Sequence, residues 1–396
     1  MSVAVDPDVA ARPDPPSRWS APIGAGLALI GLLFLGLAIS LWFQSSPGWG
    51  YDFRAYFEAA LRLLATGTPY QAETLGGPFR PGPFGLYMYS PPLAVLFAPL
   101  TQLGEQTAIL VWLGVRLALL VLTCALMPVS RPIRLATFGV AALSAPVLID
   151  LTLGNVSLIV TFFAVVTWRW LDKPIGSLAI AASLTLRPTM ALVCGWWLLR
   201  GLWRPVAWTV GAFLVLAVLT LPFVGLDRWT EYLTVLRNVS DVTGVFKNVD
   251  LGSAVLLFGG SAQLASISLF AGYAVALGAV VFSLRRDREL SYVVTVSATL
   301  LLSPLLWDHY LTNLLVPAAF LVSRGRRWGL ALPLLCWLPM LVEAVLPASR
   351  DAAYGLLAFV ALAGLLLPFA APARGEPAGL FLERLGRRTA TRPARA

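Results

Sequence analysis

An aspartate at the start of a predicted helix is the first residue whose position suggests chemistry. Asp52 lies in GWGYDFRAYFEAALRLLATGTPY, residues 48–70, directly after a long apolar run. A carboxylate near an apolar, water-poor pocket can act as a general base and take a proton from a sugar hydroxyl. The alternative is that Asp52 only caps the helix. Glu58 is the rival acid, but a spacing of six residues points the two side chains to different sides of a helix.

Two basic side chains further along the chain could face an anion. Arg187 precedes Pro188 between two short apolar runs, and an ionisable group at membrane depth usually has a partner or lines a cavity. Its guanidinium fork matches a phosphate, and the alternative is an ion pair with a buried acid such as Asp150. His309 is the single histidine and follows a proline break. It could donate to a phosphate oxygen, with Asp308 fixing its tautomer, or be structural.

Polar and aromatic residues complete the candidate site. Tyr87 and Tyr89 precede paired prolines, which start a helix, and the tyrosines could also line a sugar or lipid site. Asn155 lies in a turn between apolar runs, where it either caps the next helix or binds a substrate hydroxyl. The full set of candidate substrate-lining residues is Arg54, Tyr56, Glu58, Tyr87, Tyr89, Asn155, Trp307 and Asp308.

The chemistry expected of these residues requires no metal or cofactor. The chain has no Walker loop, no dinucleotide-binding glycine pattern and no HExxH motif, and its one Asp-x-Asp falls at residues 6–8. The cysteines, which number 3, all lie in apolar runs, where a free thiol behaves as a small hydrophobe. We therefore predict no metal site, no cofactor and no disulfide framework.

The composition indicates which kind of protein must hold these residues in place. Of 396 residues, 58% are hydrophobic and 12% are charged, whereas a soluble domain is about 25% charged. The mean hydropathy is +0.78. These values exclude a soluble enzyme and a disordered or fibrous chain, and they predict an all-α polytopic membrane protein. The net charge of +9 is best explained by cationic loops that orient the membrane spans, so nucleic acid is not expected as a partner.

Apolar runs predict about 10–12 transmembrane helices, several of them short enough to be broken or re-entrant. With the N-terminus inside, most lysines and arginines fall on the inner side, which predicts cytoplasmic termini. The predicted organisation is a disordered tail at 1–20, one transmembrane domain at 21–372 and a basic tail at 373–396. Outer loops are expected at 44–90, where helical spacing of apolar residues predicts an amphipathic helix, and at 225–250. The candidate spans are 21–43, 105–127, 132–150, 154–171, 175–187, 188–200, 205–224, 262–284, 290–304, 309–323, 328–347 and 352–372.

Five segments in this order resemble glycosyltransferase family 87. They are GYDFRAYFEAA with GTPY, MYSPPLAVLFAPL, LGNVSLIV, ASLTLRPTMAL and SPLLWDHY. The resemblance covers roughly residues 45–323, and the aspartate of the first loop with the aromatic-Pro-Pro element is its most specific part. Where the family often has Lys-Pro, this chain has Arg187-Pro188, which keeps the charge but changes its geometry.

The resemblance implies a GT-C-type fold and a metal-independent, inverting transfer at the outer face of a bacterial plasma membrane. Asp52 would be the catalytic base, and Arg187 and His309 would face the donor phosphate. The implied partners are a polyprenyl-phosphate mannose donor, a mannosylated glycolipid or lipoglycan acceptor, and membrane lipids. Two alternatives stay open, namely the same fold with a polyprenyl-phosphate arabinofuranose donor, and a lipid or sugar transporter without enzymatic activity.

Overall fold

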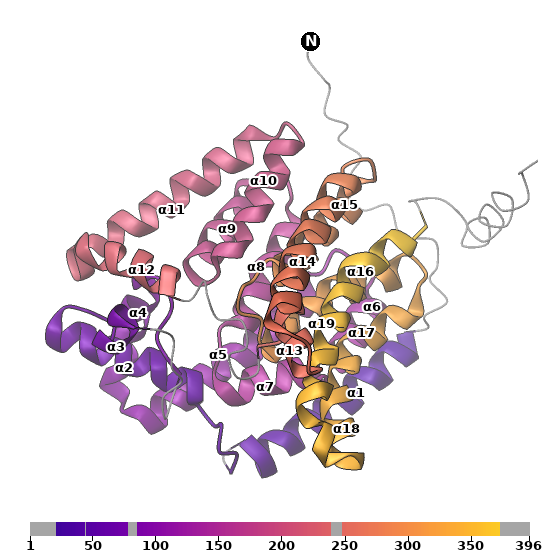
Figure 1. Cartoon of the computed structure of the whole chain (residues 1–396), viewed down its shortest axis with the longest axis horizontal. Coiled ribbons are helices and arrows are strands. Elements are labelled where there is room, and N and C mark those ends of the chain that lie inside the picture. Colours follow the sequence, from indigo (N-terminus) through magenta and orange to yellow (C-terminus); the bar gives the residue numbers. More distant parts are fainter. Residues whose placement is uncertain (1–20, 44, 78–84, 239–247, 373–396) are drawn as a thin grey trace, which may run out of the picture.

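The structure of the chain, a computed structural model, describes residues 21–43, 45–77, 85–238 and 248–372 (Figure 1). Within these ranges every regular element is a helix, which confirms the all-α fold class. The predicted tails at 1–20 and 373–396 lie outside the described residues.

Six helices in the described ranges are long and apolar enough to cross a membrane, which makes the chain a polytopic membrane protein. These spans cover Ala21–Leu41, Glu105–Leu126, Trp203–Val224, Ala262–Ser283, Arg327–Val345 and Asp351–Ala370. They are formed by α1 (Ala21–Ala38) with η2 (Ile39–Phe43), by α5 (Glu105–Leu126), α11 (Trp203–Val224) and α14 (Ala262–Ser283), by the run η6 (Arg327–Leu330), α17 (Ala331–Leu334), η7 (Leu335–Trp337) and α18 (Leu338–Val345), and by α19 (Arg350–Leu366) with η9 (Leu367–Ala370). The short η8 (Pro347–Ser349) joins the last two spans.

The larger predicted count also includes apolar runs that the structure divides. The pair α6 (Arg131–Leu143) and α7 (Ala145–Leu153) is bent by 61° at Ser144 and can count as a seventh span. Shorter apolar helices are α8 (Ser157–Arg169), α9 (Pro174–Leu186), and η4 (Pro188–Met190) with α10 (Ala191–Leu199). Proline explains two of the breaks, because Pro146 and Pro188 cannot donate a helical backbone hydrogen bond.

The two predicted outer segments lie together at one end of the molecule (Figure 1). The first contains α2 (Tyr51–Thr66) and α3 (Ala72–Gly76), and it leads directly into α4 (Pro91–Phe97) and η3 (Ala98–Leu103). The second contains α12 (Asp227–Asn238). The Thr68 hydroxyl donates to Glu231 at 2.9 Å, and the Asn238 amide donates to the Thr74 carbonyl at 2.9 Å. The amphipathic helix expected in the first segment is α2, whose apolar side packs against α4 and η3.

A largely buried group of helices lies in the interior of the molecule. It contains α8, α13 (Leu251–Leu257), α15 (Arg288–Leu301), η5 (Asp308–Leu314) and α16 (Leu315–Ser323). From Leu290 to Leu301 every residue of α15 is buried, and every residue of η5 is buried as well. This position explains why the only histidine of the chain, on η5, is inside the protein.

Glycine allows α1 to pack closely on α6. A β-carbon built at Gly139 would lie 2.2 Å from the carbonyl oxygen of Leu27, closer than any real contact. Gly31 on α1 is similarly close to the backbone of Gly139. The two backbones therefore touch directly, as small residues permit in membrane helix pairs.

Candidate active site

Asp52 lies in the first turn of α2, but it does not cap the helix. Gly50 occupies the cap position with a left-handed φ of 70°, and no side chain makes a capping hydrogen bond there. The Gly50 amide instead donates to the Thr152 carbonyl at 2.8 Å and ties the start of α2 to the end of α7. The Asp52 side chain points inward and is only 8% exposed. Capping, the alternative to a chemical role, therefore finds no support.

Asn155 is the hydrogen-bond partner of the Asp52 carboxylate within the described ranges. Its Nδ2 donates to Asp52 Oδ2 at 2.8 Å and approaches the Tyr89 hydroxyl at 3.3 Å. The Tyr56 hydroxyl in turn donates to that of Tyr89 at 3.1 Å. The Oδ1 of Asn155 accepts from the backbone N–H of Ser157 at 2.9 Å, so the residue also helps to begin α8. The helix-start interpretation of Asn155 thus accounts for its Oδ1, and binding of a substrate hydroxyl stays a prediction.

Arg187, in the break between α9 and η4, faces the same place. Its Nη2 donates to Ser157 Oγ at 2.9 Å, and its guanidinium carbon lies 3.7 Å from the centre of the Tyr310 ring. The predicted alternative partner, Asp150, pairs instead with Arg116, 3.7 Å away. No acidic side chain of the described residues forms an ion pair with Arg187, and its Nη1 is buried without a hydrogen-bond partner.

His309 and Asp308 begin η5 beside these groups. The backbone N–H of His309 donates to Asp308 Oδ1 at 2.8 Å, and the ring Nδ1 lies 3.3 Å from the same oxygen. In the described part of the chain the opposite ring nitrogen, Nε2, is buried and has no hydrogen-bond partner. A carboxylate that accepts from Nδ1–H leaves Nε2 as the acceptor of the neutral ring, or as a second donor when the ring is protonated. Trp307 stacks near the imidazole, with ring centres 5.6 Å apart.

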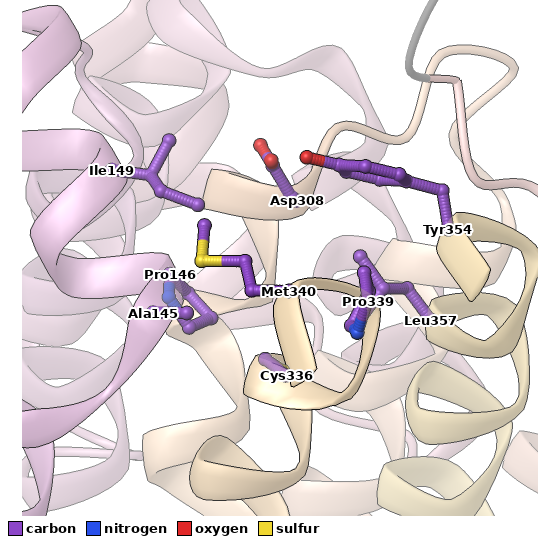
Figure 2. Close-up of a pocket in the computed structure, with 9 residues that line it drawn as sticks. All are labelled: Ala145, Pro146, Ile149, Asp308, Cys336, Pro339, Met340, Tyr354 and Leu357. Atoms are coloured by element: carbon purple, nitrogen blue, oxygen red, sulfur yellow. The ribbon is translucent and has the colours of Figure 1, made fainter. Parts of the chain in front are cut away.

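A small hollow opens on the other side of Asp308 (Figure 2). The Asp308 carboxyl and the Tyr354 hydroxyl point toward one another at its rim, and Ile149 and Met340 lie beside them (Figure 2). Asp308 is its only charged lining residue, and the others are Ala145, Pro146, Ile149, Cys336, Pro339, Met340, Tyr354 and Leu357. Asp52, Arg187 and His309 do not line this hollow.

A continuous hydrogen-bond chain joins Asp52 to Arg187. Arg187 donates to Ser157 Oγ, the Ser157 hydroxyl donates to Asn155 Oδ1 at 2.8 Å, and Asn155 donates to Asp52. Burial raises the pKa of Asp52, while the nearby His309 and the Asn155 hydrogen bond oppose that rise. The arrangement combines a buried proton acceptor with a cation whose Nη1 has no hydrogen-bond partner among the described residues, which suits proton removal near an anionic group.

Three predicted lining residues lie apart from this group. Arg54 is part of an exposed ion pair with Glu105, 2.7 Å away. Glu58 is half-buried on α2 and interacts electrostatically with Arg62, and no hydrogen bond or ion pair of the described residues joins it to the Asp52 group. The Tyr87 hydroxyl accepts from the Ala94 amide at 2.9 Å and donates to the Ser90 carbonyl at 2.6 Å, so this side chain holds the start of α4.

Sequence reasoning missed Ser157, Tyr310 and Gly85. Ser157 follows Asn155 at the spacing of an Asx turn, which is a readable signal, but the contacts to Arg187 require the folded chain. Gly85 lies beside the base candidate, because a β-carbon built on it would lie 2.7 Å from Asp52 Oδ1. In the described ranges no group of three or more His, Cys, Asp or Glu side chains is arranged to hold a metal ion.

The chain matches a known protein family. The model of glycosyltransferase family 87 matches residues 87–307, which is more than half of the chain and includes Asn155, Arg187 and Trp307. Neither a curated protein nor a solved structure matches the chain.

Proposed function

Because the chain belongs to glycosyltransferase family 87, we propose that it moves a mannosyl residue from polyprenyl-phosphate mannose to a glycolipid or lipoglycan acceptor. Glycosyltransferase activity follows from the family, and the apolar helices make the chain a multi-pass membrane protein. The donor, the acceptor and the outer face of a bacterial plasma membrane are the proposed parts.

The hydrogen-bond chain between Asp52 and Arg187 is the observation that supports this proposal most directly. Inverting transfer needs a base near the acceptor hydroxyl and positive charge near the departing phosphate. Asp52 has the chemistry for the first role. Arg187, with a buried Nη1 that has no partner in the described part of the chain, and His309, with a buried Nε2 in the same condition, have the chemistry for the second.

The proposed reaction proceeds by a single displacement. Asp52 takes the proton from an acceptor hydroxyl while that oxygen attacks the anomeric carbon on the face opposite the phosphate. The bond between the anomeric carbon and the phosphate oxygen breaks, and its electron pair stays on the phosphate. Arg187 and His309 stabilise that charge, so the polyprenyl phosphate leaves without an added proton. The proton that Asp52 holds returns to water before the next cycle.

The proposed orientation has the termini inside and Asp52 on the outer side. The two segments predicted to be outer, 44–90 and 225–250, contact each other through Thr68 and Glu231 and through Thr74 and Asn238. Segments that share one side of a membrane can touch in this way, and the basic loops favour the opposite side for the cytoplasm.

The test uses purified protein in nanodiscs with radiolabelled donors. We expect transfer from polyprenyl-phosphate mannose, undiminished by a metal chelator, and none after Asp52→Asn although the variant stays folded. Glu58→Gln is the matched control, since it changes an acid on the same helix outside the pocket, and it should keep most of the activity. Transfer from polyprenyl-phosphate arabinofuranose alone would show that the donor sugar is arabinofuranose and not mannose. Near-normal turnover by Asp52→Asn would show that Asp52 is not the base.

A further inference from the structure

We propose that Asn155 is the positioning residue of Asp52: it holds Oδ2 and leaves Oδ1, next to Gly85, as the oxygen that receives the proton. This inference rests on the proposed function, because it takes Asp52 as the base. It assigns different tasks to the two oxygens of one carboxylate.

The orientation of the Asn155 amide is determined by its neighbours. A backbone N–H can only donate, and that of Ser157 lies 2.9 Å from Asn155 Oδ1. The hydroxyl of Ser157 also reaches Oδ1, at 2.8 Å. A flipped amide would place its NH₂ group against the Ser157 N–H, so the assignment does not have the usual ambiguity of asparagine. The NH₂ group must therefore face Asp52.

Burial holds this amide in place. Asn155 is completely buried, and its two ends bond to groups on different helices, α8 through Ser157 and α2 through Asp52. A hydrogen bond to a charged acceptor is shorter and stronger than one between neutral groups, and the 2.8 Å distance agrees with this. Rotation of the carboxylate would break that bond, so Oδ2 stays with Asn155 and Oδ1 points elsewhere.

The other oxygen faces the space left by a missing side chain. A β-carbon built on Gly85 would lie 2.7 Å from Asp52 Oδ1 and 3.5 Å from the β-carbon of Ala55. The Gly85 amide donates to the Tyr51 carbonyl at 3.0 Å, which fixes this stretch of chain against the start of α2. No hydrogen bond within the described residues reaches Oδ1. A side chain at position 85 would therefore crowd Oδ1, the oxygen to which we expect the acceptor hydroxyl to give its proton.

Other charged and titratable groups also influence Asp52. They are His309 and Asp308 of η5, Arg116 of α5, Asp150 of α7, Tyr51 and Tyr56 of α2, Tyr89 of the first outer segment, and Tyr310 of η5. A test of Asn155 must leave all of these unchanged. It must also separate the donor that faces Asp52 from the acceptor that begins α8.

The first experiment titrates Asp52 without any sugar. The infrared C=O band of its protonated carboxyl is identified by its loss in Asp52→Asn. Asn155→Ser keeps an oxygen that can accept from the residue 157 N–H but is too short to reach Asp52, and Asn155→Asp keeps the acceptor while removing the donor. In both variants we expect the proton-binding constant of Asp52 to rise about tenfold or more, because a hydrogen bond to a charged group stabilises it by at least that factor.

Asn248→Ser is the matched control. Asn248 is buried, its Oδ1 accepts from the Leu306 amide at 2.9 Å and its Nδ2 donates to the Pro304 carbonyl at 3.0 Å. Asn248→Ser loses a comparable buried donor and should leave the titration midpoint of the Asp52 C=O band unchanged. An unchanged midpoint in folded Asn155→Ser and Asn155→Asp would overturn the positioning role. Asn155→Asp introduces a carboxyl at residue 155 with a C=O band of its own. That band is identified in the double variant Asp52→Asn/Asn155→Asp, which lacks the Asp52 carboxyl.

The second experiment tests the oxygen. Gly85→Ala should lower kcat at least tenfold with the donor that the wild type uses, with the folded fraction of the variant measured by thermal unfolding on the same preparation. Full activity in Gly85→Ala would refute Oδ1 as the receiving oxygen. Failure of the proposed function and failure of this inference give different results. A wild type that transfers no sugar refutes the proposed function, whereas the infrared titration, which uses no sugar, still decides the role of Asn155.

Discussion

Two buried arginines lie near the candidate site, and the structure predicts opposite consequences for their removal. Arg116 is fully buried, pairs with Asp150, and donates to the carbonyls of Asp150 at 2.5 Å and Leu151 at 2.8 Å. Arg187 is also buried, but its described contacts are the Ser157 hydroxyl and the Tyr310 ring, with no carboxylate. The first arginine therefore stabilises the end of α7, while the second has binding capacity left over.

The magnitudes follow from these contacts. Arg116→Met leaves the Asp150 carboxylate buried without its cation, and loss of one partner of a buried pair costs about 3–5 kcal/mol. For a chain of this length we expect the thermal midpoint to fall by about 5–10 °C. Arg187→Met leaves no acid behind, so its unfolding free energy should change by less than about 1 kcal/mol. Loss of one charged hydrogen bond to a phosphate, about 1.5–3 kcal/mol, should lower kcat/KM for the donor roughly 10- to 150-fold.

The assay combines thermal unfolding in nanodiscs with donor kinetics on the same preparations. Arg54→Met is the control, since its exposed pair with Glu105 should contribute less than about 1 kcal/mol and leave kcat/KM nearly unchanged. The kcat/KM of Arg187→Lys for the donor should lie between those of the wild type and Arg187→Met, because an ammonium keeps the charge but not the planar fork of the guanidinium. If Arg187→Met is as unstable as Arg116→Met while its folded fraction keeps normal kinetics, the assignment of Arg187 to the phosphate is refuted.

Three further predictions concern stability and the link between the two ends of the site. Burial raises the folded-state pKa of Asp52, so its stabilising contribution is complete below the unfolded pKa of about 3.9 and is lost as pH rises through the raised value. The thermal midpoint of Asp52→Asn should therefore match that of the wild type near pH 4 and exceed it at higher pH. Plots of thermal midpoint against pH that run parallel for the two proteins would contradict this. Gly139→Val should separate α1 from α6 and cost about 3 kcal/mol or more, whereas Gly36→Val, at a position with open space, should cost under about 1 kcal/mol in the same unfolding assay. Ser157→Ala removes the Arg187 contact and the hydroxyl bond to Asn155 Oδ1, but it keeps the backbone N–H that holds the Asn155 amide in the same orientation. The donor KM should therefore rise severalfold while the pH profile of kcat keeps its shape, and Ser297→Ala on α15 is a buried control.

The class of protein and the three principal candidates could be predicted from the sequence because each has a local signature. Long apolar runs with few charges indicate membrane helices whatever their arrangement. Asp52, Arg187 and His309 stand out because ionisable groups in apolar surroundings are energetically unfavourable without a function or a partner. The amphipathic helix now seen as α2 followed from periodicity, which is also a local property.

The partners of these residues depend on contacts between distant segments. The sequence left open whether Asp150 pairs with Arg187, and the folded chain pairs it with Arg116, 34 positions away. Asp52 and Asn155 are separated by 103 positions, and their bond needs the close approach of α2 to the end of α7, to which the Gly50 amide contributes. The number of full-length spans was equally hidden, since proline-broken runs keep their apolar composition while their geometry changes. Composition and periodicity thus determined the membrane class and the candidate site residues. The pairing of charges, and the lack of a partner for Arg187 Nη1 among the described residues, were decided by packing, because hydrogen bonds depend on distances that no local pattern records.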